Sequence, residues 1–180
     1  MTNIPILDLG PYLAGDLEAR EDLAEQLKHI QQSIGFYVVT NHGVPLQPIV
    51  HAYDALANFF ALPLNEKLKL TIDETSVGYI PAKSTIYVTS KINDNTKPDI
   101  NETITLARER AADDPAIQQG MRFVGPNHWP DSLPEFREAM LAYQDALSVL
   151  GYAMLPLYAR ALGLHAEFFA PYFTEPMWWT

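Results

Sequence analysis

The sequence contains no cysteine among its 180 residues. A disulfide framework and a thiolate metal site are therefore both excluded, and a reducing compartment is the natural setting. The sequence also lacks an apolar run of about 20 residues, the length that crosses a bilayer. Its first residues lack the basic region and apolar stretch of a secretory signal. We therefore expect a cytoplasmic protein.

Basic residues are scarce as well. The chain carries 12 Lys and Arg against 22 Asp and Glu, which gives a formal net charge of −10. That charge repels the phosphates of nucleic acids and of anionic membrane surfaces. We therefore expect neither a nucleic acid nor a membrane as a partner.

Two common kinds of catalytic motif are missing. The sequence has no Gly-x-Ser-x-Gly elbow, and no cysteine replaces the serine nucleophile. It also has no glycine-rich loop of the Walker or dinucleotide-binding type. Hydrolase chemistry and nucleotide binding are therefore not indicated.

The sequence does contain a pattern of α+β elements, beginning with a short apolar strand over residues 4–9. A helix follows, for which Asp16 is the predicted N-cap and Gly35 the C-terminal stop. Residues 36–40 are β-branched and aromatic, which favours a second strand before the turn at Asn41. The residues of the first helix predicted to lie in the core are Leu23, Leu27, Ile30 and Ile34.

A second helix is predicted to begin near Pro48, since proline is tolerated in a first turn. A short helix follows the chain reversal at 62–67, and partial alternation over 84–89 and 103–106 favours strands or a hairpin. The face of the second helix predicted to be buried consists of Ile49, Tyr53, Leu56 and Phe60.

The last third of the sequence is predicted to be mainly helical. A loop over 108–120 precedes Ser132-Leu133-Pro134-Glu135, a capping-box pattern that opens a long helix. Pro156 should kink or end that helix. A short aromatic helix is predicted around Phe168.

The five histidines are candidate metal ligands, because non-haem iron oxygenases use two histidines and one carboxylate. Only His165-Ala166-Glu167 has the His-x-carboxylate spacing, but it falls in a predicted helical turn, where side chains two residues apart diverge. We favour a solvated or capping role for His165. Structural roles are likewise favoured for the others, which are His29, His42, His51 and His128.

Two further sites contain side chains that could take part in chemistry. His42 follows a strand in an Asn-His-Gly turn, where backbone hydrogen bonds can hold its imidazole, and a structural turn is the preferred interpretation. Asp99 and Glu102 could in principle form an acid/base pair. Carboxylates at the start of a predicted strand usually face water, and we favour that interpretation.

Several segments together resemble the N-terminal region of the iron(II)/2-oxoglutarate oxygenases related to isopenicillin N synthase. The strongest resemblance is Gly35-Phe36-Tyr37-Val38-Val39-Thr40-Asn41-His42-Gly43-Val44, and the match is collinear over essentially the whole chain. The other matching segments are Ile4–Leu9, Phe59–Lys67, Gly78-Tyr79, Lys97–Glu102, Asn127–Pro130, the long helix and Leu162–Leu164.

The resemblance implies an α+β fold with a helical N-terminal region and the opening strands of a double-stranded β-helix, or jelly roll. In relatives the two His, the Asp and the Arg-x-Ser that grips 2-oxoglutarate lie beyond the matched part. We therefore expect residues 1–180 to be the N-terminal region, with the catalytic jelly-roll core downstream and incomplete here. We expect no catalytic residue and no metal ligand in this chain.

The resemblance also implies a function. The parent enzyme would bind Fe(II) and 2-oxoglutarate and hydroxylate or otherwise oxidise a small molecule, while this chain alone would hold neither cofactor and be inactive. In relatives the segment resembling Gly78-Tyr79 approaches the substrate, which makes Tyr79, Ile80 and Tyr87 the candidate substrate contacts. Core packing is the alternative for all three.

Two alternatives to this function stay open. One is an oxidase of the same family that does not use 2-oxoglutarate. The other is a non-catalytic interaction module, in which the exposed aromatic end docks on a partner or on a second copy of the chain. In the parent enzyme the missing C-terminal half would cover that end. The residues of that end are Phe168, Phe169, Tyr172, Phe173, Met177, Trp178 and Trp179.

Overall fold

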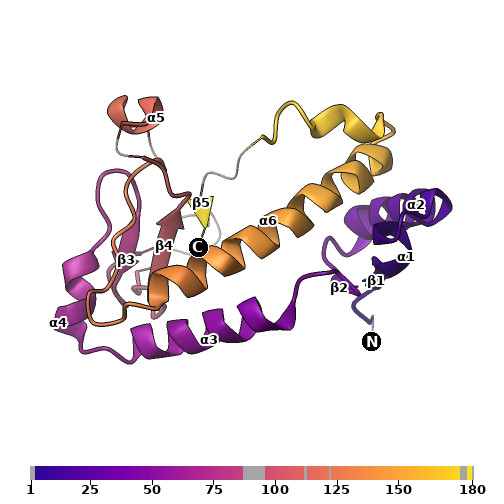
Figure 1. Ribbon diagram of the computed structural model, residues 1–180. Coiled ribbons are helices and arrows are strands. Elements are labelled where there is room, and N and C mark those ends of the chain that lie inside the picture. The colour runs from indigo at the N-terminus through magenta and orange to yellow at the C-terminus, as the bar shows by residue number, and fades with distance from the viewer. Residues whose placement is uncertain (1–2, 87–95, 112, 122, 175–177, 180) are drawn as a thin grey trace. The chain divides into compact units, whose positions relative to one another are not determined.

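The computed structural model describes residues 3–86, 96–111, 113–121, 123–174 and 178–179, and these form an α+β structure (Figure 1). The chain divides into two compact units, each built from two segments. Unit 1 comprises Met1–Ile49 and Ala142–Glu175, and unit 2 comprises Val50–Leu141 and Pro176–Thr180.

The main helices follow the order predicted from the sequence, but several short elements were not predicted, among them a helix inside the loop expected over 108–120. The elements of the structure follow in chain order. They are β1 (Ile6–Asp8), α1 (Gly10–Leu13), α2 (Leu17–Ser33), β2 (Val38–Thr40), α3 (Leu46–Phe60), α4 (Leu64–Lys67), the 3₁₀ helix η1 (Leu68–Leu70), β3 (Gly78–Ile80), β4 (Thr103–Ala107), α5 (Pro115–Gln118), α6 (Phe136–Ala161), the 3₁₀ helix η2 (Ala166–Phe169) and β5 (Trp178–Trp179).

Unit 1 is built around a two-stranded parallel sheet. β1 pairs with β2 in the register Ile6 with Val38 and Asp8 with Thr40. A hairpin cannot join parallel strands, so α2 serves as the crossover connection between them. Leu7 points into the core and is fully buried, whereas Ile6 and Val38 are 63% and 47% exposed on the other face.

Helix α2 covers the buried face of this sheet. Asp16 caps the helix, since its carboxylate accepts hydrogen bonds from the backbone N–H groups of Glu18 and Ala19, as predicted. Gly35 has a positive φ of 82°, which suits its position just past the helix end. The buried core residues of unit 1 are Leu7, Leu9, Leu23, Leu27, Ile30, Met154 and Leu157.

Helix α6 runs through Pro156 without ending there and continues to Ala161. A proline inside a helix has no N–H to donate to the carbonyl four residues earlier. In the turn before this proline, another element of unit 1 contacts the helix backbone, because the hydroxyl of Tyr12 donates to the carbonyl oxygen of Ala153 at 2.8 Å. The helix therefore does not end at Pro156, contrary to one of the two predicted outcomes, and a kink there stays a prediction.

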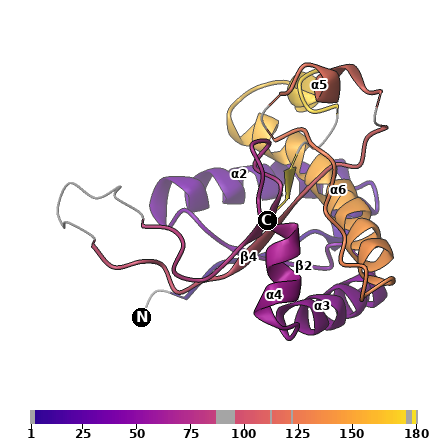
Figure 2. The ribbon, with the colours of Figure 1, turned by 90° about the vertical axis from the view of Figure 1, so that its left-hand side faces the viewer.

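Unit 2 contains an antiparallel sheet, in which β4 lies between β3 and β5. Figures 1 and 2 show β3 and β4 side by side, with Tyr79 opposite Ile104 in the register. Phe59 and Phe136 are buried beneath this sheet, and their ring centroids lie 5.2 Å apart. The sheet and these aromatic rings form the core of unit 2.

Two predicted elements differ in detail. Helix α3 begins at Leu46 and buries Ala52 and Phe59, whereas Tyr53 is 71% exposed. Its sequence is apolar on several faces, so the periodicity alone did not select the correct one. The predicted strand over 84–89 is not a strand at 84–86, and residues 87–89 lie outside the described part of the chain.

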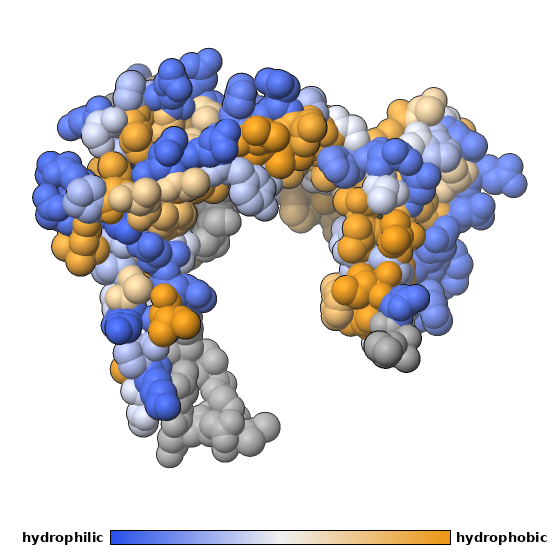
Figure 3. All heavy atoms as spheres, turned by 90° about the horizontal axis from the view of Figure 1, so that it is seen from below, coloured by the Kyte–Doolittle hydropathy of each residue, from blue (hydrophilic) through white to orange (hydrophobic). Residues whose placement is uncertain are grey.

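Apolar side chains reach the surface at several places in the view of Figure 3. Within the described ranges, no helix combines the length and apolar character that crossing a bilayer requires.

Candidate functional site

Strand β3 carries two of the three residues predicted to contact substrate. Tyr79 is 1% exposed, and its ring packs edge-to-face against Phe59 with 5.9 Å between centroids. Ile80, the next residue, is half-buried. Tyr87 lies outside the described residues. Substrate contact by these three side chains stays a prediction, with Tyr79 packed in the core of unit 2.

The phenol of Tyr79 belongs to a polar cluster that also contains Lys67 and Glu102. Glu102 Oε2 accepts hydrogen bonds from Tyr79 Oη at 2.5 Å and from Lys67 Nζ at 2.7 Å. Lys67 Nζ also donates to the carbonyl oxygen of Phe60 at 2.9 Å. Lys67 is only 7% exposed, and an ammonium group buried to that degree is stable only when it is paired.

The environment fixes the protonation of this cluster. The hydrogen bonds from Lys67 and then Tyr79 lower the pKa of Glu102. Burial, followed by the hydrogen bond to the Glu102 carboxylate, raises the pKa of Tyr79 to about 12. At neutral pH Glu102 is therefore a carboxylate and Tyr79 a neutral phenol, and neither is poised to exchange a proton.

The cluster corrects the interpretation of Glu102. The sequence favoured a water-facing carboxylate beside Asp99, but Glu102 is bound to Lys67 and Tyr79, and its side chain is 32% exposed. The Asp99 carboxylate instead accepts from the backbone N–H of Asn101 at 3.0 Å. An acid/base pair of Asp99 and Glu102 has no support in this geometry.

A second polar contact in unit 2 joins His128 to Asp73. His128 Nε2 lies 3.1 Å from Asp73 Oδ2, while Asp73 Oδ1 accepts from Thr75 Oγ1 at 2.6 Å. Burial acts to raise the pKa of Asp73, but the hydrogen bonds from Thr75 and His128 outweigh it and lower the pKa. His128 therefore ties two loops together, a role that its loop position in the sequence did not reveal.

Asn127, the residue before His128, closes the end of β4. Its side-chain oxygen accepts from the backbone N–H of Ala107 at 2.7 Å, and its amide nitrogen donates to the Ala107 carbonyl at 2.9 Å. The side chain thus satisfies both backbone groups of one strand residue. The sequence alone did not indicate this role for Asn127.

The described residues do not fit an iron centre. No group of three or more His, Asp and Glu side chains lies close enough to hold a metal within the ranges that the structure describes. His165 Nδ1 accepts from the backbone N–H of Glu167 at 3.3 Å, so His165 caps η2, which agrees with the capping role favoured from the sequence. His42 Nδ1 accepts from Val44 N–H at 3.1 Å, as predicted for the turn.

The comparisons with known proteins identify the family. Residues 4–132 match the family described as non-haem dioxygenase in morphine synthesis N-terminal. The 2-oxoglutarate-Fe(II) type oxidoreductase hxnY of Emericella nidulans is 32% identical over 172 residues, which cover 93% of this chain and 48% of the relative. Kihadalactone A synthase LFS of Citrus sinensis is 33% identical over 148 residues, which cover 81% of this chain and 42% of that relative.

Solved structures show the same relationship. A full-length Neurospora crassa protein in complex with alpha-KG and thymine superposes with a TM-score of 0.72 at 26% identity, covering 92% of this chain and 50% of that one. A 2OG-Fe(II) oxygenase family protein from Caulobacter crescentus has a TM-score of 0.75 at 22% identity, and the match covers 95% of this chain and 52% of that one. At this identity the likeness shows the fold alone.

The chain spans about half the length of the curated relatives that it matches. The match within it is extensive, since the family region 4–132 contains β1 to β4 and both polar clusters of unit 2. This chain belongs to the iron(II)/2-oxoglutarate oxygenase family and carries the family's N-terminal region.

Proposed function

We propose that this chain is the N-terminal part of an iron(II)/2-oxoglutarate-dependent oxygenase that oxidises a small molecule in the cytoplasm. The observation that carries the proposal is the family match over residues 4–132. Iron(II) and 2-oxoglutarate would supply the oxidation chemistry in the parent enzyme. The residues that hold them would belong to a jelly-roll core encoded downstream, because the described residues here do not fit a metal centre.

Two surfaces of the chain support a downstream core. The outer face of the β1–β2 sheet exposes Ile6 and Val38, although parallel strands are normally buried on both faces. The segment that follows α6 exposes Phe168, Tyr172 and Phe173 by 44%, 72% and 51%. A further part of the protein packed on these surfaces would remove the apolar area from water.

The contribution of this half to the parent enzyme would be structural and substrate-facing. The Lys67, Glu102 and Tyr79 cluster fixes β3 against the start of β4, and Ile80 extends from β3 on the face opposite Tyr79. We infer that Ile80 contacts the substrate, together with Tyr87 and the strand that carries Tyr79. The role of Tyr79 would then be to hold that strand, with its ring in the core.

The substrate class follows from the relatives. The Neurospora crassa structure contains thymine, a small heterocyclic molecule, and kihadalactone A synthase is named for a small-molecule product. A small organic substrate is therefore proposed for the parent of this chain. The net charge of −10 favours a neutral or cationic molecule over a polyanion.

The test compares the 180-residue chain with the product of the gene read in frame beyond Thr180. Both are incubated with iron(II), ascorbate and 2-oxoglutarate, and succinate is measured. The longer product should form succinate, and a His→Ala change in its downstream His-x-Asp motif should abolish this. The 180-residue chain should stay at background.

Each alternative predicts a different result. Succinate formation by the 180-residue chain would refute its proposed inactivity. Oxidation of a substrate by the longer product without consumption of 2-oxoglutarate would identify an oxidase of the same family. A stop codon directly after Thr180, with no activity, would favour the interaction module.

A further inference from the structure

Unit 1 contains an apolar groove, and its lining residues include no member of the Lys67, Glu102 and Tyr79 cluster. Its volume is about 420 Å³, and its walls come from the loop 42–45, from Leu13 and from one face of α6. The α6 residues on this face recur at helical spacing, with Ala146 and Ala153 as its smallest side chains. The volume lies within the range of about 300–1,000 Å³ that is typical of small-molecule sites.

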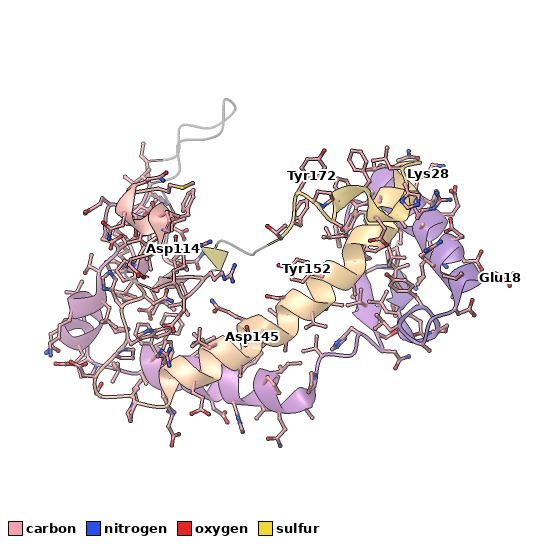
Figure 4. The ribbon with its side chains drawn as sticks, turned by 45° about the horizontal axis from the view of Figure 1, so that its top comes forward. Glu18, Lys28, Asp114, Asp145, Tyr152 and Tyr172 are labelled. Carbon is pink, nitrogen blue, oxygen red and sulfur yellow. The ribbon has the colours of Figure 1, made fainter. Side chains whose placement is uncertain are left out.

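The charge in the groove has one sign. Asp145, labelled on α6 in Figure 4, supplies the one carboxylate among the lining residues, and none of them is Lys or Arg. Within the described part of the chain, Asp145 forms neither a hydrogen bond nor an ion pair. An exposed carboxylate beside an apolar wall attracts a group that combines a cation with an apolar body.

His42 adds a polar group with a defined orientation of its ring. Its Nδ1 accepts from the backbone N–H of Val44, so the neutral imidazole carries its proton on Nε2. The other lining residues are apolar or glycine. The groove thus offers one carboxylate, one imidazole ring held by a backbone hydrogen bond, and apolar walls.

We propose that this groove binds a small organic amine, with its apolar part against Ala146, Val149 and Leu150 and its ammonium group at Asp145. Anionic ligands are disfavoured because the lining residues include no basic side chain. A small molecule is favoured over a peptide because the groove has the volume of a single small ligand. The site does not depend on the proposed oxygenase activity.

The test titrates the 180-residue chain with 2-phenylethylamine while ¹H–¹⁵N correlation spectra are recorded. We expect saturable shifts of the Gly43, Val44 and Ala146 amides, with a Kd of about 1 mM, as befits a small ligand in an open site. The neutral analogue 2-phenylethanol should bind at least about two-fold more weakly, because an exposed ion pair contributes modestly.

Two substitutions separate the charge from the groove. Asp145→Asn should weaken binding of the amine by about two- to five-fold and leave the affinity for 2-phenylethanol unchanged, since only the ion pair is lost. Ala146→Phe should weaken binding of both ligands, because its ring fills the groove. Asp54→Asn is the matched control, because Asp54 is an exposed helical carboxylate outside the groove; it should change neither affinity.

Several results would overturn the proposal. Shifts that do not saturate, or that map outside the groove, would show that no such site exists. Equal binding of the amine and the alcohol, or equal effects of Asp145→Asn and Asp54→Asn, would remove the role of Asp145. A basic amphipathic peptide that displaces the amine at a hundred-fold lower concentration would replace a small molecule with a protein partner as the occupant.

Discussion

The phenol of Tyr79 donates a 2.5 Å hydrogen bond to the carboxylate of Glu102, and this contact joins the middle of β3 to the residue that precedes β4. The same carboxylate oxygen accepts from Lys67, which in turn binds the carbonyl at the end of α3. One partly buried anion therefore connects the sheet of unit 2 with the helices that precede it.

Removal of the Tyr79 hydroxyl should destabilise the chain measurably. Tyr79→Phe keeps the buried ring but leaves the carboxylate one donor short, and hydrogen bonds to charged groups contribute about 1.5–3 kcal/mol. Urea denaturation should report a loss of that size. Tyr53→Phe, on a side chain that is 71% exposed, is the control and should lie within about 0.5 kcal/mol of the parent chain.

The same cluster should make stability depend on pH at both ends of the scale. The pKa of Glu102 is lowered on folding, so its contribution is present above the unfolded value near 4.5 and is lost as the pH falls through the folded value. The pKa of Tyr79 is raised from 10.0 to about 12, so its contribution is present below 10 and is lost as the pH rises toward 12.

These dependences can be assigned with Glu102→Gln. Unfolding free energies measured from pH 3 to pH 7 should show the largest difference between this variant and the parent chain at pH 7, and a shrinking difference below about pH 4.5. A difference that stays constant across this range would mean that ionised Glu102 does not stabilise the fold.

Gly78 should not tolerate a side chain. Its φ is +125°, and a Cβ would lie 2.7 Å from the Leu70 carbonyl oxygen. Gly78→Ala should cost at least about 1–3 kcal/mol from the backbone conformation alone. Gly151→Ala is the opposite case, since nothing lies within 4 Å of its added Cβ on helix α6, and it should stabilise the chain by about 0.5–1 kcal/mol. Thermal unfolding of the two variants should shift in opposite directions.

Asn127 offers a nearly isosteric test of backbone recognition. Asn127→Asp keeps the acceptor for Ala107 N–H but turns the donor into a second acceptor that faces the Ala107 carbonyl. We expect a loss of about 1–3 kcal/mol at pH 7, where the new carboxyl group is ionised, and a partial recovery at pH 3, where its proton restores a donor. Equal stability of the variant at both pH values would contradict this arrangement.

Local signals in the sequence were sufficient for much of unit 1. Asp16 and Gly35 lie at the two ends of α2, as predicted, because capping and a positive φ depend on chemistry within a few residues. The turn at His42 was predicted for the same reason. The exposure of Ile6 and Val38 was not, because an apolar run of six residues does not reveal which face of the strand is buried.

Long-range polar contacts were out of reach of the sequence. Lys67 and Glu102 are separated by 35 positions, and His128 and Asp73 by 55. Neither pair has a spacing that marks it, so Glu102 was expected to face water and no partner was predicted for His128. Pairings of this kind depend on how the strands and loops pack, which no local pattern encodes.

The length of α2 is coupled to the pairing of the two strands that it connects. Deleting one helical turn would shorten this connection by about 5.4 Å, more than the rise of about 3.3 Å for one strand residue. A slip of one residue between Ile6 and Val38 would turn Leu7 outward. The length of α2 therefore helps to set the register of β1 and β2. Insertions and deletions should be tolerated less well within α2 than in the loops of the chain.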